Sequence, residues 1–167
     1  MSTRGCFGWR FNGEDKIGFN YADSYPSGLG TGVLNFIRSF GSMDAIKDYA
    51  AEVELIDDEE ADSYDGQSFK QKFHDSASFM HNSLFCEWAY IINVDTEMLE
   101  IYKGFNQDEH SEGRYVLPGK EREWLDEIYY GVALVKEIPL EDILAGNPEK
   151  FTNDDEKELS KEGEEND

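Results

Sequence analysis

An α+β fold is predicted for this chain, with a mostly antiparallel sheet built from hairpins and helices packed on it. Two observations predict it: an aromatic hairpin pattern opens the chain, and a second hairpin pattern follows two amphipathic segments. Hairpin connections imply antiparallel pairing, and amphipathic helices bury their apolar side against a sheet. The 167 residues suffice for one domain with a hydrophobic core, which we assign to residues 1–151.

The first hairpin is predicted from residues 7–21. Aromatic side chains alternate with smaller or polar ones over residues 7–11, which is typical of a strand with one buried face. Asn12-Gly13 follows at once and accepts the positive φ angles of a tight turn. A second alternating run, residues 17–21, completes the hairpin.

Two helices are predicted next. Thr31 can cap the first, whose apolar residues lie at helical spacing until Gly41 ends it. Ser42 is the predicted cap of the second. A short amphipathic helix is expected between Phe69 and Met80.

The second half of the chain alternates between strand and helix patterns. The expected elements are strands at 88–94 and 98–105 joined by a turn at 95–97, a short strand at 115–117, a helix at 120–128, a strand at 130–138 and a helical turn at 139–144. Beyond Phe151 only Leu159 is apolar. We therefore predict that residues 152–167 form a disordered acidic tail.

The net charge of −22 is unevenly distributed. Residues 52–65 hold eight acids and no base, and residues 154–167 hold eight acids and two lysines, so these segments contribute −8 and −6. Such a field disfavours direct binding of nucleic acid or anionic membranes and favours a partner with a basic surface. Solvation of loops is the plainer interpretation of the same acids.

Other classes of site find little support in the sequence. His74 and His81 lack ligands at metal-binding spacing, and Ala61 and Lys72 would occupy ligand positions of a calcium loop around Gly66. No phosphate-binding loop is complete, so neither a metal nor a cofactor is expected. No signal peptide or membrane-spanning run is visible, which predicts a cytoplasmic location. Cys6 and Cys86 are expected to be reduced core thiols.

Arg4 and Asp23 stand near the open end of the first hairpin and could line a site with Tyr25. One hypothesis is an N-terminal-nucleophile amidohydrolase, in which removal of Met1 exposes Ser2, Arg4 binds a substrate carboxylate, and Asp23 or Asn20 orients the amine. That hypothesis rests on an analogy of element order. A small-ligand site between Arg4 and Tyr25 is another hypothesis. A purely structural hairpin is the plain interpretation.

Several motifs are similar to an uncharacterised family of small bacteriophage and bacterial proteins. They are Thr3-Arg4-Gly5, Gly8-Trp9-Arg10, the Asn12-Gly13 turn, the block from Asp23 to Gly30, and the pattern from Trp88 to Gly104. The resemblance covers about two thirds of the chain and implies a phage or prophage origin without assigned chemistry. Relatives carry a histidine before the Asp-Ser-Tyr-Pro block, where this chain has Asn20-Tyr21-Ala22.

Charge and resemblance together predict a non-enzymatic acidic protein that binds and modulates or inhibits a host protein, such as a nucleic-acid-processing or defence enzyme. Carboxylates can occupy a surface built for phosphates. The predicted binding residues are Arg4, Asp23, Tyr25, Asp57, Asp58, Glu59, Glu60 and Asp62.

Overall fold

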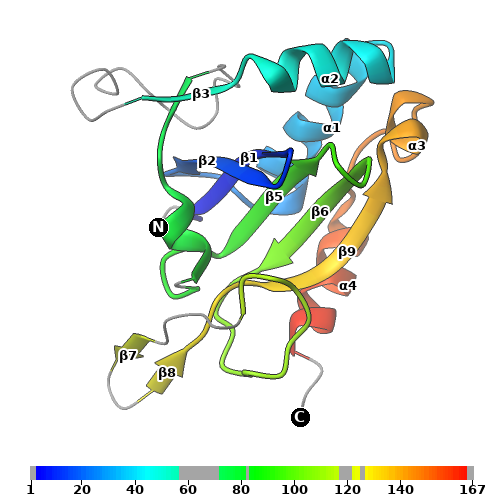
Figure 1. The fold of residues 1–167 in the computed structure, drawn as a ribbon. Coiled ribbons are helices and arrows are strands. Elements are labelled where there is room, and N and C mark those ends of the chain that lie inside the picture. Colours follow the sequence, from blue (N-terminus) through cyan, green and yellow to red (C-terminus); the bar gives the residue numbers. More distant parts are fainter. Residues whose placement is uncertain (1–2, 57–71, 82, 117–121, 125–126, 165–167) are drawn as a thin grey trace.

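A five-stranded sheet forms the centre of the computed structural model, which describes residues 3–56, 72–81, 83–116, 122–124 and 127–164 (Figure 1). Its strands are β1 (Gly5–Phe11), β2 (Glu14–Asn20), β5 (Trp88–Asn93), β6 (Met98–Lys103) and β9 (Ala133–Pro139). They are ordered β2-β1-β5-β6-β9. The β1–β2, β5–β6 and β6–β9 pairs are antiparallel, whereas β1 and β5 are parallel, so the sheet is mixed. The predicted α+β class with antiparallel hairpins is confirmed.

One face of the sheet carries the helices. The alternation of β1 turns Phe7 and Trp9 toward α1 (Thr31–Ser39), α2 (Met43–Ala51), α3 (Leu140–Leu144) and the chain's last helix. Side chains from these helices and from β5 and β6 complete the larger apolar core. Ser42 caps α2 as predicted, because its side chain accepts from the Ala45 amide at 3.2 Å.

The opposite face carries a smaller core under loops. Cys6, Ile17 and Ile91 pack there with Met80 of the 3-10 helix Ala77–His81. Tyr115 and Val132 belong to the same smaller core. Cys6 and Cys86 are free and buried, as predicted, and burial raises the pKa of the Cys6 thiol.

The two hairpins are joined at their turns. Because β1 and β5 are parallel, the turns after them lie at the same end of the sheet. The Asp95 carboxylate accepts from the amides of Asn12 and Gly13 at 2.7 and 2.8 Å. These hydrogen bonds lower the pKa of Asp95.

Three local predictions were wrong. The segment expected to be a helix at 120–128 contains a small hairpin of β7 (Arg122–Trp124) and β8 (Glu127–Tyr129), because its short apolar pattern fits either period. Tyr115 and Val116 lie in a turn. In place of a helix ending near Met80, the described residues form β4 (Lys72–His74), paired in parallel with β3 (Glu54–Ile56), and the 3-10 helix.

The prediction that residues 152–167 are a disordered tail requires correction over residues 153–164, which form α4 (Asn153–Glu164), whereas residues 165–167 lie outside the described residues. Leu159 is buried, which anchors the helix to the larger core. Thr152 and Asp155 form a capping box: the Thr152 amide donates to Asp155 Oδ2 at 2.8 Å and the Asp155 amide to Thr152 Oγ1 at 3.1 Å. One apolar contact and a good cap thus order a segment that its composition alone marks as disordered.

Candidate functional site

Arg4 and Asp23, the predicted site residues of the first hairpin, have different partners. The Arg4 guanidinium lies 5.2 Å from the Phe85 ring centroid, 3.9 Å from Glu87 Oε2, and donates to the Leu84 carbonyl at 3.4 Å. The Asp23 carboxylate instead accepts from the Tyr25 hydroxyl at 3.4 Å and raises the pKa of that phenol. The structure therefore pairs Arg4 with Glu87 rather than Asp23.

The Asp23–Gly30 block forms a turn that is hydrogen-bonded both within itself and to the surrounding chain. Ser24 is buried, and its hydroxyl accepts from Asn20 Nδ2 at 2.8 Å. Tyr90 donates to the Ser24 carbonyl at 2.8 Å. The left-handed φ of 56° at Asp23 turns the chain into the π-helical segment Pro26–Gly30. Asn20 therefore holds the turn together.

The remaining predicted site residues, Ser2 and the acids Asp57, Asp58, Glu59, Glu60 and Asp62, lie outside the described residues.

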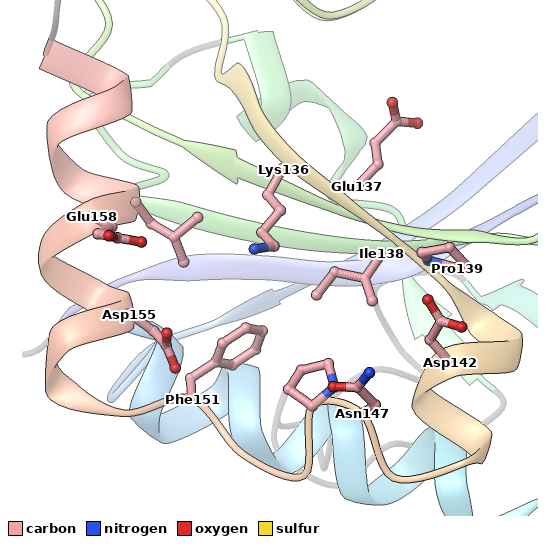
Figure 2. Close-up of a pocket in the computed structure, with 11 residues that line it drawn as sticks. Lys136, Glu137, Ile138, Pro139, Asp142, Asn147, Phe151, Asp155 and Glu158 are labelled. Atoms are coloured by element: carbon pink, nitrogen blue, oxygen red, sulfur yellow. The ribbon is translucent and has the colours of Figure 1, made fainter.

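A groove of about 340 Å³ lies between β9, α3 and α4 (Figure 2). Its apolar lining consists of Ile138, Pro139, Pro148, Phe151 and Leu159. Its polar lining consists of Lys136, Glu137, Asp142, Asn147, Asp155 and Glu158. Three of these carboxylates, those of Asp142, Asp155 and Glu158, lie on the helix side with Lys136, whereas the Glu137 side chain points away from the groove (Figure 2). Since β9 is the outermost strand of its sheet, the groove lies at the sheet edge.

Each wall of the groove is held by contacts to the core. Alternation along β9 turns Lys136 and Ile138 toward the helix side, and Figure 2 shows both side chains directed into the groove. The connecting loop is fixed by Arg38, which donates to the carbonyls of Pro148 and Glu149 at 3.1 and 2.7 Å. The Phe151 amide donates to Thr31 Oγ1 at 3.0 Å.

The α4 wall has a second anchor. Glu156 accepts a hydrogen bond from the Ser27 amide at 2.5 Å, at the start of the π-helical segment. Glu156 therefore faces the core-bound turn, and it is not among the residues that line the groove. Glu158 does line the groove and is exposed, as is Asp142 at the other side. Two exposed carboxylates on opposite walls are free to meet a cation between them.

A cluster of charged side chains on the opposite sheet face is the main alternative site. Arg114 donates to both carboxylate oxygens of Glu100 at 2.7 Å, and Glu100 also accepts from Tyr102 and Asn93 at 3.0 Å. Arg114 further donates to the Tyr115 hydroxyl at 3.0 Å.

The same cluster continues toward the first hairpin. Tyr115 donates to Asp15 at 2.7 Å, and Arg10 donates to the same carboxylate at 2.8 Å. Burial raises the pKa values of Tyr102 and Tyr115 well above the ordinary range, so both hydroxyls stay protonated. Each carboxylate here already has a cation and further donors. We therefore interpret the cluster as a structural connection between the sheet and the 106–116 loop.

Metal clusters and membrane-spanning helices are two further features to consider among the residues that the structure describes. The described part of the chain contains no group of three or more His, Cys, Asp or Glu side chains arranged to hold a metal ion. None of its helices has the length and apolar character needed to cross a bilayer. Comparison with models of known families, with curated proteins and with solved structures gives no match.

Sequence reasoning missed the groove because one of its walls is α4. Two signals were present in the sequence: the Thr152-x-x-Asp155 spacing of a capping box, and the single apolar residue Leu159 about one helical turn after Asp155. Neither indicates that α4 packs beside β9, since that contact depends on the tertiary fold.

Proposed function

We propose that this chain is a binding protein that presents carboxylates to a basic surface of a partner protein. The observation that supports the proposal most is the groove between β9, α3 and α4, where Asp142, Asp155 and Glu158 outnumber Lys136. A recess that combines apolar side chains with several carboxylates suits a side chain of opposite charge.

The charge of the whole chain favours the same class of partner. At −22, the protein repels polyanions over the range set by ionic screening and attracts cations. Carboxylates can take the place of phosphates on a protein surface that binds nucleic acid. In line with the resemblance to bacteriophage proteins, we propose a host nucleic-acid-processing or defence enzyme in the bacterial cytoplasm as the partner, whose action the chain modulates or inhibits.

The test is capture of the partner by the immobilised full chain from a nuclease-treated bacterial lysate, followed by calorimetry with the purified partner. Because the contact is electrostatic, we expect the affinity to fall about tenfold or more between about 50 and about 300 mM salt. Binding that does not change with salt, or tight binding of the chain to nucleic acid itself, would contradict the proposal.

The acidic run outside the described residues offers an independent test. Replacing Asp57, Asp58, Glu59 and Glu60 by the corresponding amides removes four negative charges. We expect weaker partner binding with an unchanged melting temperature, since removing neighbouring like charges relieves repulsion. Unchanged affinity in calorimetry would show that this run only solvates the chain.

A further inference from the structure

We infer that the groove between β9, α3 and α4 receives a lysine or arginine side chain of the partner, together with an adjacent apolar side chain. This inference rests on the proposed function and names the chemistry of the contact. Its occupant is a short basic and apolar segment of another protein.

The apolar side chain of the proposed ligand is inferred from the residues that line the groove. Ile138, Phe151 and Leu159 are buried residues of the larger core, and their surfaces toward the groove are bordered by Pro139 and Pro148. A volume of about 340 Å³ lies at the lower end of the range for ligand sites. The groove therefore suits one or two inserted side chains. The aliphatic stem of a lysine or arginine can lie along such a surface while its charged end stays in water.

The cationic side chain of the proposed ligand is inferred from the carboxylates around the groove. Asp142 of α3 and Glu158 of α4 are exposed on different walls, and Asp155 lies on the same helix as Glu158 (Figure 2). Charge complementarity therefore favours a cation over an anion in this space.

Lys136 adds a specific expectation. Its side chain extends from β9 into the groove, and it makes no ion pair with the residues that the structure describes. A cation there disfavours a second one. We therefore expect Lys136→Met to strengthen binding of a basic segment, whereas an anionic ligand would bind more weakly to that variant.

The probe is the synthetic peptide acetyl-Gly-Leu-Arg-Leu-Lys-Gly-amide, titrated into the ¹⁵N-labelled full chain and followed by NMR. We expect the shifted amides to cluster at the groove, including those of Lys136, Asp142 and Leu159. The same peptide with glutamine in place of arginine and lysine should bind more weakly, and so should one with serine in place of leucine.

Variants of the chain separate the groove from general charge. The double variant Asp142→Asn with Glu158→Gln should weaken peptide binding about three- to tenfold, and Lys136→Met should strengthen it about two- to fivefold. The matched control is Asp48→Asn with Glu112→Gln, which removes the same two charges from exposed residues elsewhere. Asp155 is left unchanged because it caps α4.

Several outcomes would overturn the inference. Equal weakening by the control variant would show diffuse attraction, and equal binding of the glutamine peptide would show apolar docking alone. Amide shifts at the groove that grow with protein concentration, without peptide, would assign the surface to a second copy of the chain. Loss of peptide binding while the captured partner still binds in a salt-dependent way would reject this groove and leave the proposed function standing.

Discussion

Removing the Arg114 guanidinium should destabilise the protein strongly, because Arg114 is the cation that pairs with the buried Glu100 carboxylate. Glu100 is 3% exposed and accepts from Arg114 twice, at 2.7 Å. Breaking a buried ion pair by removing one partner typically costs about 3–5 kcal/mol. The Arg114 side chain is itself 29% exposed, which lets water reach the site, so we expect about 3 kcal/mol for Arg114→Met.

The assay is urea unfolding followed by tryptophan fluorescence, since Trp9 and Trp88 are both buried. A loss of about 3 kcal/mol corresponds to a melting temperature lower by about 6–12 °C in a domain of this size. Adding Glu100→Gln to Arg114→Met removes the unpaired charge, so the double variant should recover about 1.5 kcal/mol or more.

The control is Lys47→Met, which breaks the exposed ion pair with Glu97 at 3.1 Å. Both of those side chains are 44% exposed, so the loss should stay within about 1 kcal/mol. A loss of less than about 1 kcal/mol for Arg114→Met, or no recovery in the double variant, would refute the structural interpretation of the cluster.

Three further predictions concern stability. Leu159→Ala should lower the free energy of unfolding by about 2–5 kcal/mol, because Leu159 joins α4 to the core, and an unchanged melting temperature would show that α4 is not docked. In the folded state the pKa values of Tyr102 and Tyr115 are raised. Their contribution to stability is fully present below about pH 10, where the unfolded phenols also keep their protons, and it is lost as the pH rises further and only the unfolded phenols ionise. Urea midpoints between about pH 8 and 11 should therefore fall less steeply in Tyr115→Phe, and parallel curves would argue against it. Arg4→Ala should cost only about 0–1 kcal/mol in thermal unfolding, because its contact with Glu87 is 3.9 Å long and partly exposed, and a larger loss would show a structural role that these contacts do not explain.

Local signals were sufficient for much of the fold. The Asn12-Gly13 turn joins β1 and β2, and Asn12 has the predicted positive φ of 55°. Ser42 caps α2 as expected. These features depend on a few neighbouring residues, so a single sequence contains the information needed to predict them.

Non-local features could not be read in this way. Nothing in β1 or β5 alone indicates their parallel pairing, because both are short apolar strands and the partner is chosen by the whole sheet. At residues 122–129 the apolar spacing fits a helix and a hairpin alike. The groove needs β9, α3 and α4 together, and α4 becomes ordered by contacts with segments more than a hundred residues away, such as Ser27 with Glu156.

The parallel β1–β5 pairing also affects the order of events during synthesis. Gly5 pairs with Trp88, so β1 meets the centre of its sheet only after half of the chain has been made. At about 5–20 residues per second, the ribosome needs about 4–16 s to pass from one strand to the other. During that time β1 and β2 can form a hairpin on which α1 and α2 can pack, but the edge of β1 that pairs with β5 stays open. The hydrogen-bonding edge of β1 therefore leaves the ribosome well before the strand that pairs with it, and an unpaired strand edge is a site at which chains can associate wrongly until that strand arrives.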